Sequence, residues 1–169
     1  MQRKNAGQMR LNREAKMAKK DIEAQIKKKG KLEDNFICLP DPEDVYTWYY
    51  IIWFNEAPFK GGYYMGKVKC PDNYPANAPQ INLLTENGRF SLQEDGICLS
   101  ISSFHPESWN PAWKVSQIVV GLSMFWLTEQ DTYGAVYEDE YPKDIPWDER
   151  RMQWAMKSRE QVMNHDKFK

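Results

Sequence analysis

The strongest constraint on the fold is a pair of runs dense in aromatic and β-branched residues, VYTWYYIIWF at 45–54 and YYMGKVKC at 63–70. Residues of these types favour strands. The segment between the runs, NEAPFKGG, is rich in turn formers. We therefore expect a meander of antiparallel strands between Phe36 and Leu84. The first run is apolar on both faces, so we expect its strand to be covered on both sides.

The next segment, CPDNYPANAPQ at 70–80, contains three prolines. Proline cannot donate a ladder hydrogen bond, which excludes a central strand here and predicts an extended connection before a short strand at 81–84. In residues 85–113 the apolar residues show neither a helical nor a strand period over any length. A loop of this length inside a compact domain usually has a function.

Helical periods flank this strand-rich region. Before it, residues 8–29 carry a narrow apolar stripe, and Gly30 stands where a C-cap belongs. After it, a second helix follows Asn110 and Pro111, and its apolar residues extend nearly all round, which predicts a buried helix. A third helix opens at Pro146. The residues assigned to these packed faces are Leu11, Ala15, Ala18, Ile22 and Ile26; Val115, Ile118, Val119, Leu122, Phe125 and Trp126, extended by Val120, Met124 and Leu127; and Met152, Ala155, Met156, Val162 and Met163.

The element order predicts an α+β fold: an N-terminal helix, a four-stranded antiparallel meander sheet, an active-site loop, a buried central helix and a C-terminal helix. The 169 residues suit a single domain, 1–169, with residues 1–7 expected to be flexible. No run of apolar residues is long enough to span a membrane, and no secretory signal is visible, so we expect a soluble protein.

The three cysteines, Cys38, Cys70 and Cys98, have neither zinc-site spacing nor the even number of a disulfide framework, which indicates a reduced, intracellular protein without a metal. Charge is unevenly distributed. Residues 1–31 carry eleven Lys and Arg, and residues 129–149 carry eight acids against one lysine. The basic segment lacks aromatic residues for stacking on bases, so we expect an acidic protein partner rather than nucleic acid.

Phosphate-binding, zinc-protease and serine-hydrolase motifs are absent from the sequence. Cys98 remains as a candidate nucleophile because it lies in a loop rich in Gly, Ser and Asn, where exposure is plausible. Free cysteines are also among the most buried residues, so a structural role stays open. His105, seven positions on, is a candidate base for Cys98 or a packing residue.

The stretch APFKGGYYMGKVKCPDNYPANAPQINLLTENGRF, followed by GICLSI and WNPAWKVSQIVVGL, resembles the core of ubiquitin-conjugating enzymes. The resemblance runs in order along nearly the whole chain and implies the fold of that family. The chain is most similar to the J-type branch, which is associated with endoplasmic-reticulum degradation. Members of this branch carry an N-G-R-F element before the cysteine and a segment like His105–Trp113 after it.

The resemblance implies that Cys98 accepts ubiquitin as a thioester from an activating enzyme. Ubiquitin would then pass to lysine, or to serine and threonine, on a protein substrate with a ubiquitin ligase. No cofactor is implied. The family's His-Pro-Asn motif is replaced by Thr85-Glu86-Asn87, so Asn87 is either an oxyanion donor or a turn former. Asp131 is a candidate acidic gate near the cysteine, and His105 is the hypothesised base for hydroxyl acceptors.

Pro111, Ala112 and Trp113 occupy the family's ligase-contacting loop, and the basic first helix resembles the face for activating enzyme and ligase. A second usual ligase contact, an aromatic residue, is Ala76 here. J-type members usually end in a membrane-spanning tail, and no such apolar run is present in this sequence. The expected location is cytoplasmic, or the cytosolic face of the endoplasmic reticulum if a C-terminal anchor has been removed.

Two alternatives remain at this point. A noncatalytic variant of the same fold would bind ubiquitin or a partner without forming a thioester, although such variants typically lack the cysteine that GICLS provides. An unrelated cysteine hydrolase would use Cys98 and His105 to turn over a model ester without other proteins.

Overall fold

The structure, a computed structural model, describes residues 5–32 and 34–167. In chain order its elements are α1 (Ala6–Lys29), β1 (Phe36–Pro40), β2 (Thr47–Ile52), β3 (Tyr64–Lys69), β4 (Gln80–Leu83), η1 (Pro106–Ser108), α2 (Val115–Thr128), η2 (Glu138–Glu140) and α3 (Trp147–Asn164). The expected α+β order is confirmed. Of the segment expected to be flexible, residues 1–4 lie outside the described residues. Asn5 caps α1, and its side chain accepts a hydrogen bond from the Gln8 N–H.

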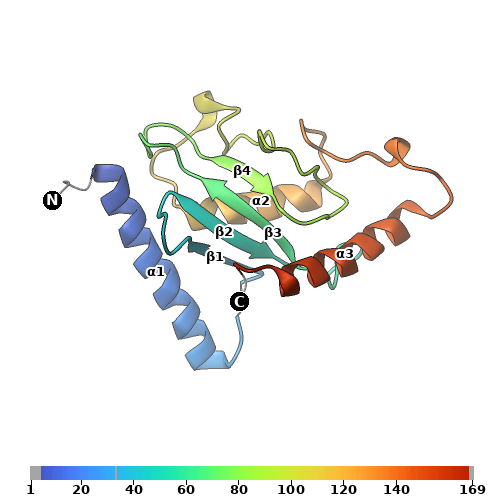
Figure 1. Cartoon of the computed structure of the whole chain (residues 1–169), viewed down its shortest axis with the longest axis horizontal. Helices are drawn as coiled ribbons and strands as arrows, with labels where there is room; N and C mark the ends of the chain where they lie inside the picture. Colours follow the sequence, from blue (N-terminus) through green and yellow to red (C-terminus); the bar gives the residue numbers. More distant parts are fainter. Residues whose placement is uncertain (1–4, 33, 168–169) are drawn as a thin grey trace.

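The four strands form one antiparallel sheet in the order β1-β2-β3-β4, which confirms the meander. Figure 1 shows α2 lying across the sheet, with α1 beside β1 and α3 beside β3. Gly66 of β3 faces Tyr50 of β2. A Cβ at Gly66 would lie 2.1 Å from the Tyr50 hydroxyl oxygen. Only glycine leaves room for that hydroxyl to donate to the main-chain oxygen of Asn82 at 2.9 Å.

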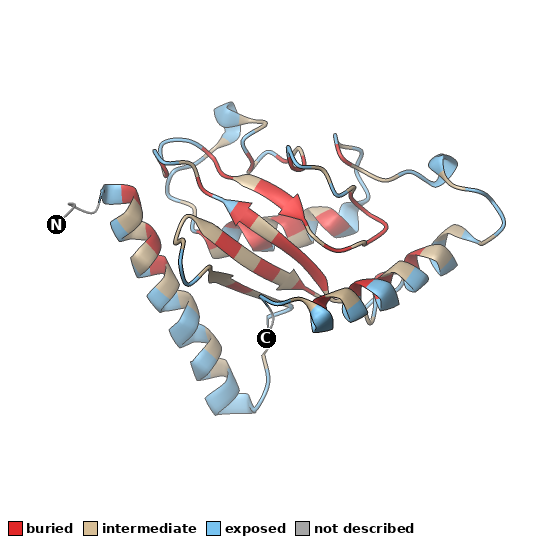
Figure 2. Cartoon of the chain, in the orientation of Figure 1, coloured by how far each residue is buried: buried red, intermediate tan, exposed pale blue. Residues whose placement is uncertain are grey.

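Burial along β2 differs between the two faces of the strand, which was expected to be covered on both sides. Trp48, Tyr50 and Ile52 are buried, whereas the residues between them are only half-buried. The alternation is visible in Figure 2. The buried face carries the core, in which the Trp126 ring of α2 packs against an aromatic cluster of Phe54, Phe59, Tyr64 and Phe90.

The predicted packing faces of the helices need three corrections. The stripe of α1 is buried at Leu11, half-buried from Ala15 to Ile22 and exposed at Ile26, so the end of the helix leaves the domain. The central helix buries its main face but exposes a second apolar face, so it is not buried all round. In α3 the exposed residues include all three of the methionines predicted to pack. The exposed residues are Val120, Met124 and Leu127 of α2, and Met152, Met156 and Met163 of α3.

The packed side of α3 consists of Arg151, Ala155, Ser158 and Val162. Their spacing is helical, but two of them are polar. The Ser158 hydroxyl donates to the Tyr63 carbonyl oxygen at 2.6 Å, and the Arg151 guanidinium binds the Glu129 carboxylate at 2.7 Å. Because these polar groups have partners, they can take buried positions that hydropathy alone assigns to methionine.

Candidate active site

The loop that carries Cys98 is fixed to the sheet by its neighbours. The Ile97 N–H donates to the Ile81 carbonyl oxygen of β4 at 2.9 Å. Ile97 and Leu99 are 1% and 4% exposed, whereas Cys98 between them is half-buried. In an extended segment, neighbouring side chains point to opposite sides. Burial of the two aliphatic residues therefore turns the cysteine away from the core.

The segment after α2 lies along the other side of Cys98. The Cys98 N–H donates to the Tyr133 carbonyl oxygen at 3.2 Å, and the Thr132 hydroxyl donates to the Cys98 carbonyl oxygen. The Tyr133 ring packs on Phe104 with centroids 5.6 Å apart. These contacts join the active-site loop to residues more than thirty positions further along. Asp131 is exposed and lies in this segment, directly before Thr132.

His105 and Cys98, the pair singled out in the sequence, are brought together. The His105 Nε2 atom lies 3.0 Å from the Cys98 Sγ atom. A compact turn returns the chain: the buried Ser102 hydroxyl accepts from the Leu99 N–H at 3.1 Å and donates to the Leu99 carbonyl oxygen at 2.8 Å. The His105 N–H then donates to the Ser102 carbonyl oxygen at 3.2 Å. Such a pair can move a proton between sulfur and ring nitrogen.

Glu107 completes this cluster and was not identified from the sequence. Its Oε1 atom lies 2.9 Å from His105 Nδ1. The hydrogen bond from His105 holds the pKa of the Glu107 carboxyl below its usual value. The sequence signal that could have identified Glu107 is a carboxylate two residues after a candidate base. Only the turn at η1, however, brings the two groups into contact.

The other two cysteines occupy different environments. Cys38 and Cys70 are 3% and 2% exposed. Burial raises the pKa of both thiols well above the usual value, because a thiolate loses its hydration in an apolar interior. Among the described cysteines, Cys98 alone combines partial exposure with a neighbouring base.

Asn87 is buried and forms hydrogen bonds within its own turn. Its amide nitrogen donates to the carbonyl oxygens of Thr85 and Phe90, both at 3.0 Å. Its side-chain oxygen accepts from the N–H groups of Arg89 and Phe90 at 2.9 and 2.7 Å. Both amide hydrogens are therefore in use, as expected for a residue that holds the turn. Of its two predicted roles, this geometry favours the turn former.

The predicted ligase-contacting loop precedes α2. Pro111 and Ala112 are exposed, and Trp113 is half-buried with its ring 5.7 Å from that of Trp109. The Trp109 indole donates to the Pro75 carbonyl oxygen at 2.8 Å. The loop thus lies beside the proline-rich segment that carries Ala76.

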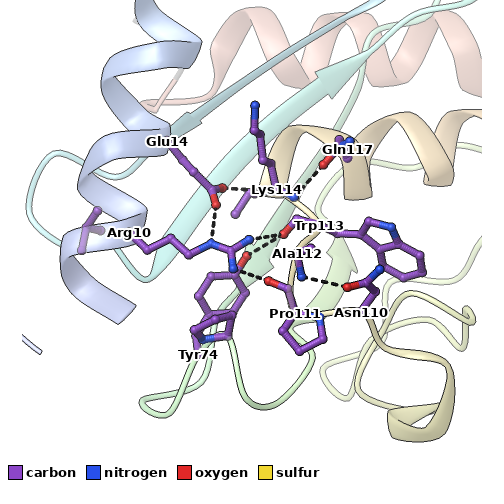
Figure 3. Close-up of polar contacts among 12 residues, drawn as sticks. Arg10, Glu14, Tyr74, Asn110, Pro111, Ala112, Trp113, Lys114 and Gln117 are labelled. Carbon is purple, nitrogen blue, oxygen red and sulfur yellow. Dashed lines mark hydrogen bonds and ion pairs between the residues drawn. The ribbon is translucent and has the colours of Figure 1, made fainter. Parts of the chain in front are cut away.

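An ion pair on α1 holds this loop, as Figure 3 shows. The Arg10 guanidinium donates to the carbonyl oxygens of Pro111 and, at 2.7 Å, Trp113. The Glu14 carboxylate binds Arg10 at 2.9 Å and also accepts the Val115 N–H at 2.9 Å. This N–H opens α2, where a negative charge is favourable. The basic helix and the loop therefore form one surface.

Within residues 5–32 and 34–167, no cluster of three or more His, Cys, Asp or Glu side chains could hold a metal ion. The same part of the chain contains no helix that combines the length and the apolar character of a membrane span.

Comparison with known proteins identifies a family for the chain. A family model described as "Ubiquitin-conjugating enzyme" matches residues 10–150. The chain is 48% identical over 101 residues to Ubiquitin-conjugating enzyme E2 34 of Arabidopsis thaliana, covering 59% of this chain and 42% of that protein. It is 40% identical over 110 residues to Ubiquitin-conjugating enzyme E2 J2 of Bos taurus, covering 64% and 42%.

Among solved structures, the H. polymorpha ubiquitin conjugating enzyme Pex4p, crystallised with the soluble domain of Pex22p, superposes with a TM-score of 0.68 at 16% identity. The match covers 90% of this chain and 98% of that one, which supports the fold. The chain spans less than half the length of the two curated relatives described above. On the family match and these relatives, the chain belongs to the ubiquitin-conjugating enzyme family and is related to its J-type branch.

Proposed function

We propose that the protein accepts ubiquitin as a thioester on Cys98 from a ubiquitin-activating enzyme. With a ubiquitin ligase, it then transfers ubiquitin to lysine, serine or threonine of a protein substrate. The observation that carries the proposal is the half-buried Cys98 thiol, held between two buried residues and 3.0 Å from the His105 ring nitrogen. Exchange between thioesters needs mainly an accessible sulfur and a positioned acyl carbon.

The decisive experiment incubates the protein with activating enzyme, ubiquitin and ATP, followed by electrophoresis with and without a reducing agent. We expect a reducible band shift that Cys98→Ala abolishes. Cys70→Ala is the matched control because its buried thiol cannot receive a protein tail, and this variant should keep the shift. Absence of any shift in the unmodified protein would contradict the proposal.

A noncatalytic member of the family is the alternative. One observation favours this alternative: both Asn87 amide hydrogens are used in hydrogen bonds within its own turn. An oxyanion at Cys98 would therefore need another donor. This alternative predicts binding of ubiquitin or a partner without a reducible shift. Turnover of a model ester by the protein alone would instead indicate a cysteine hydrolase.

For hydroxyl acceptors, we propose His105 as the general base. Deprotonating a hydroxyl requires a base more than attack by a neutral amine does, and general bases contribute about 10²- to 10⁴-fold. His105→Gln should therefore slow discharge of the Cys98 thioester to serine more than discharge to lysine. Equal discharge to serine by this variant and the unmodified protein would remove the role. From the resemblance to the J-type branch, we also propose action in endoplasmic-reticulum-associated degradation, at the cytosolic face of the endoplasmic reticulum if a C-terminal anchor has been removed.

A further inference from the structure

We propose that Glu107 is a positioning residue for His105. It holds the imidazole in the tautomer whose proton is on Nδ1, so that the lone pair of Nε2 faces the reacting sulfur. The inference rests on the proposed function of Cys98 and His105 and adds a third member to that pair.

The distances define a chain of three groups. Cys98 Sγ lies 3.0 Å from His105 Nε2, and His105 Nδ1 lies 2.9 Å from Glu107 Oε1. An ionised carboxylate only accepts hydrogen bonds, so Nδ1 must be the donor. In a neutral ring the other nitrogen then carries the lone pair, and it points at the Cys98 sulfur.

Short-range structure holds the carboxylate in place. Pro106 fixes the backbone between the two side chains at the start of η1. The Ser108 N–H donates to the His105 carbonyl oxygen at 3.0 Å and closes the turn. The side chains at 105 and 107 consequently meet on one side of the turn, although Glu107 is 69% exposed.

Two other acidic residues described near Cys98 are Asp95 and Asp131. The Asp95 carboxylate accepts from the Tyr133 hydroxyl at 3.1 Å. Asp131 lies on the segment beside the Cys98 backbone, before Thr132. Among the described residues, Glu107 is the carboxylate found within hydrogen-bond distance of the His105 ring.

The tautomer matters for the transfer step. After loading, Cys98 is acylated and no longer offers a proton, so Nε2 is free. An acceptor hydroxyl oxygen attacks the thioester carbonyl carbon, and its proton passes to Nε2. The new carbon–oxygen bond forms as the carbon–sulfur bond breaks, and the imidazolium returns its proton to the leaving sulfur. Glu107 stabilises the transient positive charge on the ring through the Nδ1 hydrogen bond.

The first test observes the tautomer directly. The chain contains two histidines, so long-range ¹H–¹⁵N spectra of a His165→Gln protein report His105 alone. We expect the Nδ1–H form to dominate there and to lose population when Glu107→Ala is added. Glu94→Ala, which removes an exposed carboxylate elsewhere in the loop, should leave the spectrum unchanged. An unchanged tautomer in the Glu107 variant would overturn the inference.

The second test measures single-turnover discharge of the loaded protein to serine. Because the contact is exposed, Glu107→Ala should slow discharge about five- to tenfold. Combined with His105→Gln it should add no further loss, since Glu107 acts through the ring. Discharge at the unmodified rate, or an additional loss in the double variant, would contradict the inference. If the unmodified protein fails to load, the proposed function fails, whereas the tautomer measurement still decides the role of Glu107.

Discussion

The Glu14 carboxylate accepts the main-chain N–H of Val115, 101 residues further along, at 2.9 Å. The same side chain binds Arg10, whose guanidinium reaches the carbonyl oxygens of the loop before α2. Two residues one turn apart on α1 therefore hold the start of the central helix and the predicted ligase-contacting loop (Figure 3). The N-terminal helix is thus a structural part of that surface.

Replacing Glu14 should destabilise the domain. Glu14 is 8% exposed, and Glu14→Ala leaves the buried Val115 N–H without its partner. Loss of a hydrogen bond to a charged group predicts a decrease in the free energy of unfolding of about 2 kcal/mol. Urea denaturation measures it. Glu23→Ala, an exposed glutamate on the same helix, is the control and should change stability by less than about 0.5 kcal/mol. Equal stability of the two variants would contradict this view of Glu14.

Replacing Arg10 should affect the ligase surface rather than the chemistry. Arg10→Ala removes both hydrogen bonds to the loop at 111–113, which then samples other conformations. We expect slower discharge with a cognate ligase, about threefold or more, since ordering the loop becomes part of binding. Discharge to free lysine without a ligase should be unchanged. Arg13→Ala, an exposed arginine on the same helix, is the matched control. An equal decrease in the discharge rate without a ligase would contradict the expectation.

The general fold could be predicted from the sequence because its determinants are local. Aromatic and β-branched runs define the strands, and Ile97 and Leu99 flank a cysteine that the loop composition leaves partly exposed. On the packed face of α3, Ala155 and Val162 were predicted, but the polar positions could not be predicted in the same way. Ser158 is buried because its hydroxyl has two hydrogen-bond partners, the Tyr63 carbonyl and the Thr85 hydroxyl, and these come from distant parts of the chain.

The site shows the same limit. The pairing of Cys98 with His105 depends on the turn that Ser102 closes. The sequence offered His105 as a candidate base but did not place its ring. Glu107 was missed because its contact with His105 arises from the direction of one short turn. Asn87 differed in another way, since its sequence motif suggested two roles and its four hydrogen bonds favour one of them.

The corrected face of α3 can be tested by a pair of truncations. Val162 is fully buried, whereas Met163 is 52% exposed. Val162→Ala should lower the free energy of unfolding by about 2 kcal/mol, because it removes buried carbon and leaves a cavity. Met163→Ala should change it by less than about 0.5 kcal/mol, as at most exposed positions. A larger loss for Met163 than for Val162 in thermal or urea unfolding would place Met163 back on the packed side.

Asn87→Ala should act through stability. The variant leaves the carbonyl oxygens of Thr85 and Phe90 and two N–H groups without their side-chain partner. Unpaired buried polar groups predict a loss of about 2 to 3 kcal/mol in the free energy of unfolding. If the residue only holds its turn, the fraction that stays folded at low temperature should discharge its thioester at a rate close to that of the unmodified protein. If the discharge rate of the folded fraction instead falls by about 100-fold, Asn87 is an oxyanion donor.

The pKa of Glu107 gives a prediction that does not require ubiquitin. The hydrogen bond from His105 lowers the pKa of the folded carboxyl. A lowered folded pKa means that this contact stabilises the fold above the unfolded glutamate pKa, and that its contribution is lost as pH falls through the folded pKa.

In His105→Gln, the ring donor is absent, and we expect the Glu107 carboxyl to titrate closer to an ordinary glutamate. Carbon-detected NMR titration of the glutamate side chains measures the change. If Glu107 titrates alike in both proteins, the ring does not interact with the carboxylate in solution, and the chain from Cys98 through His105 ends at the imidazole.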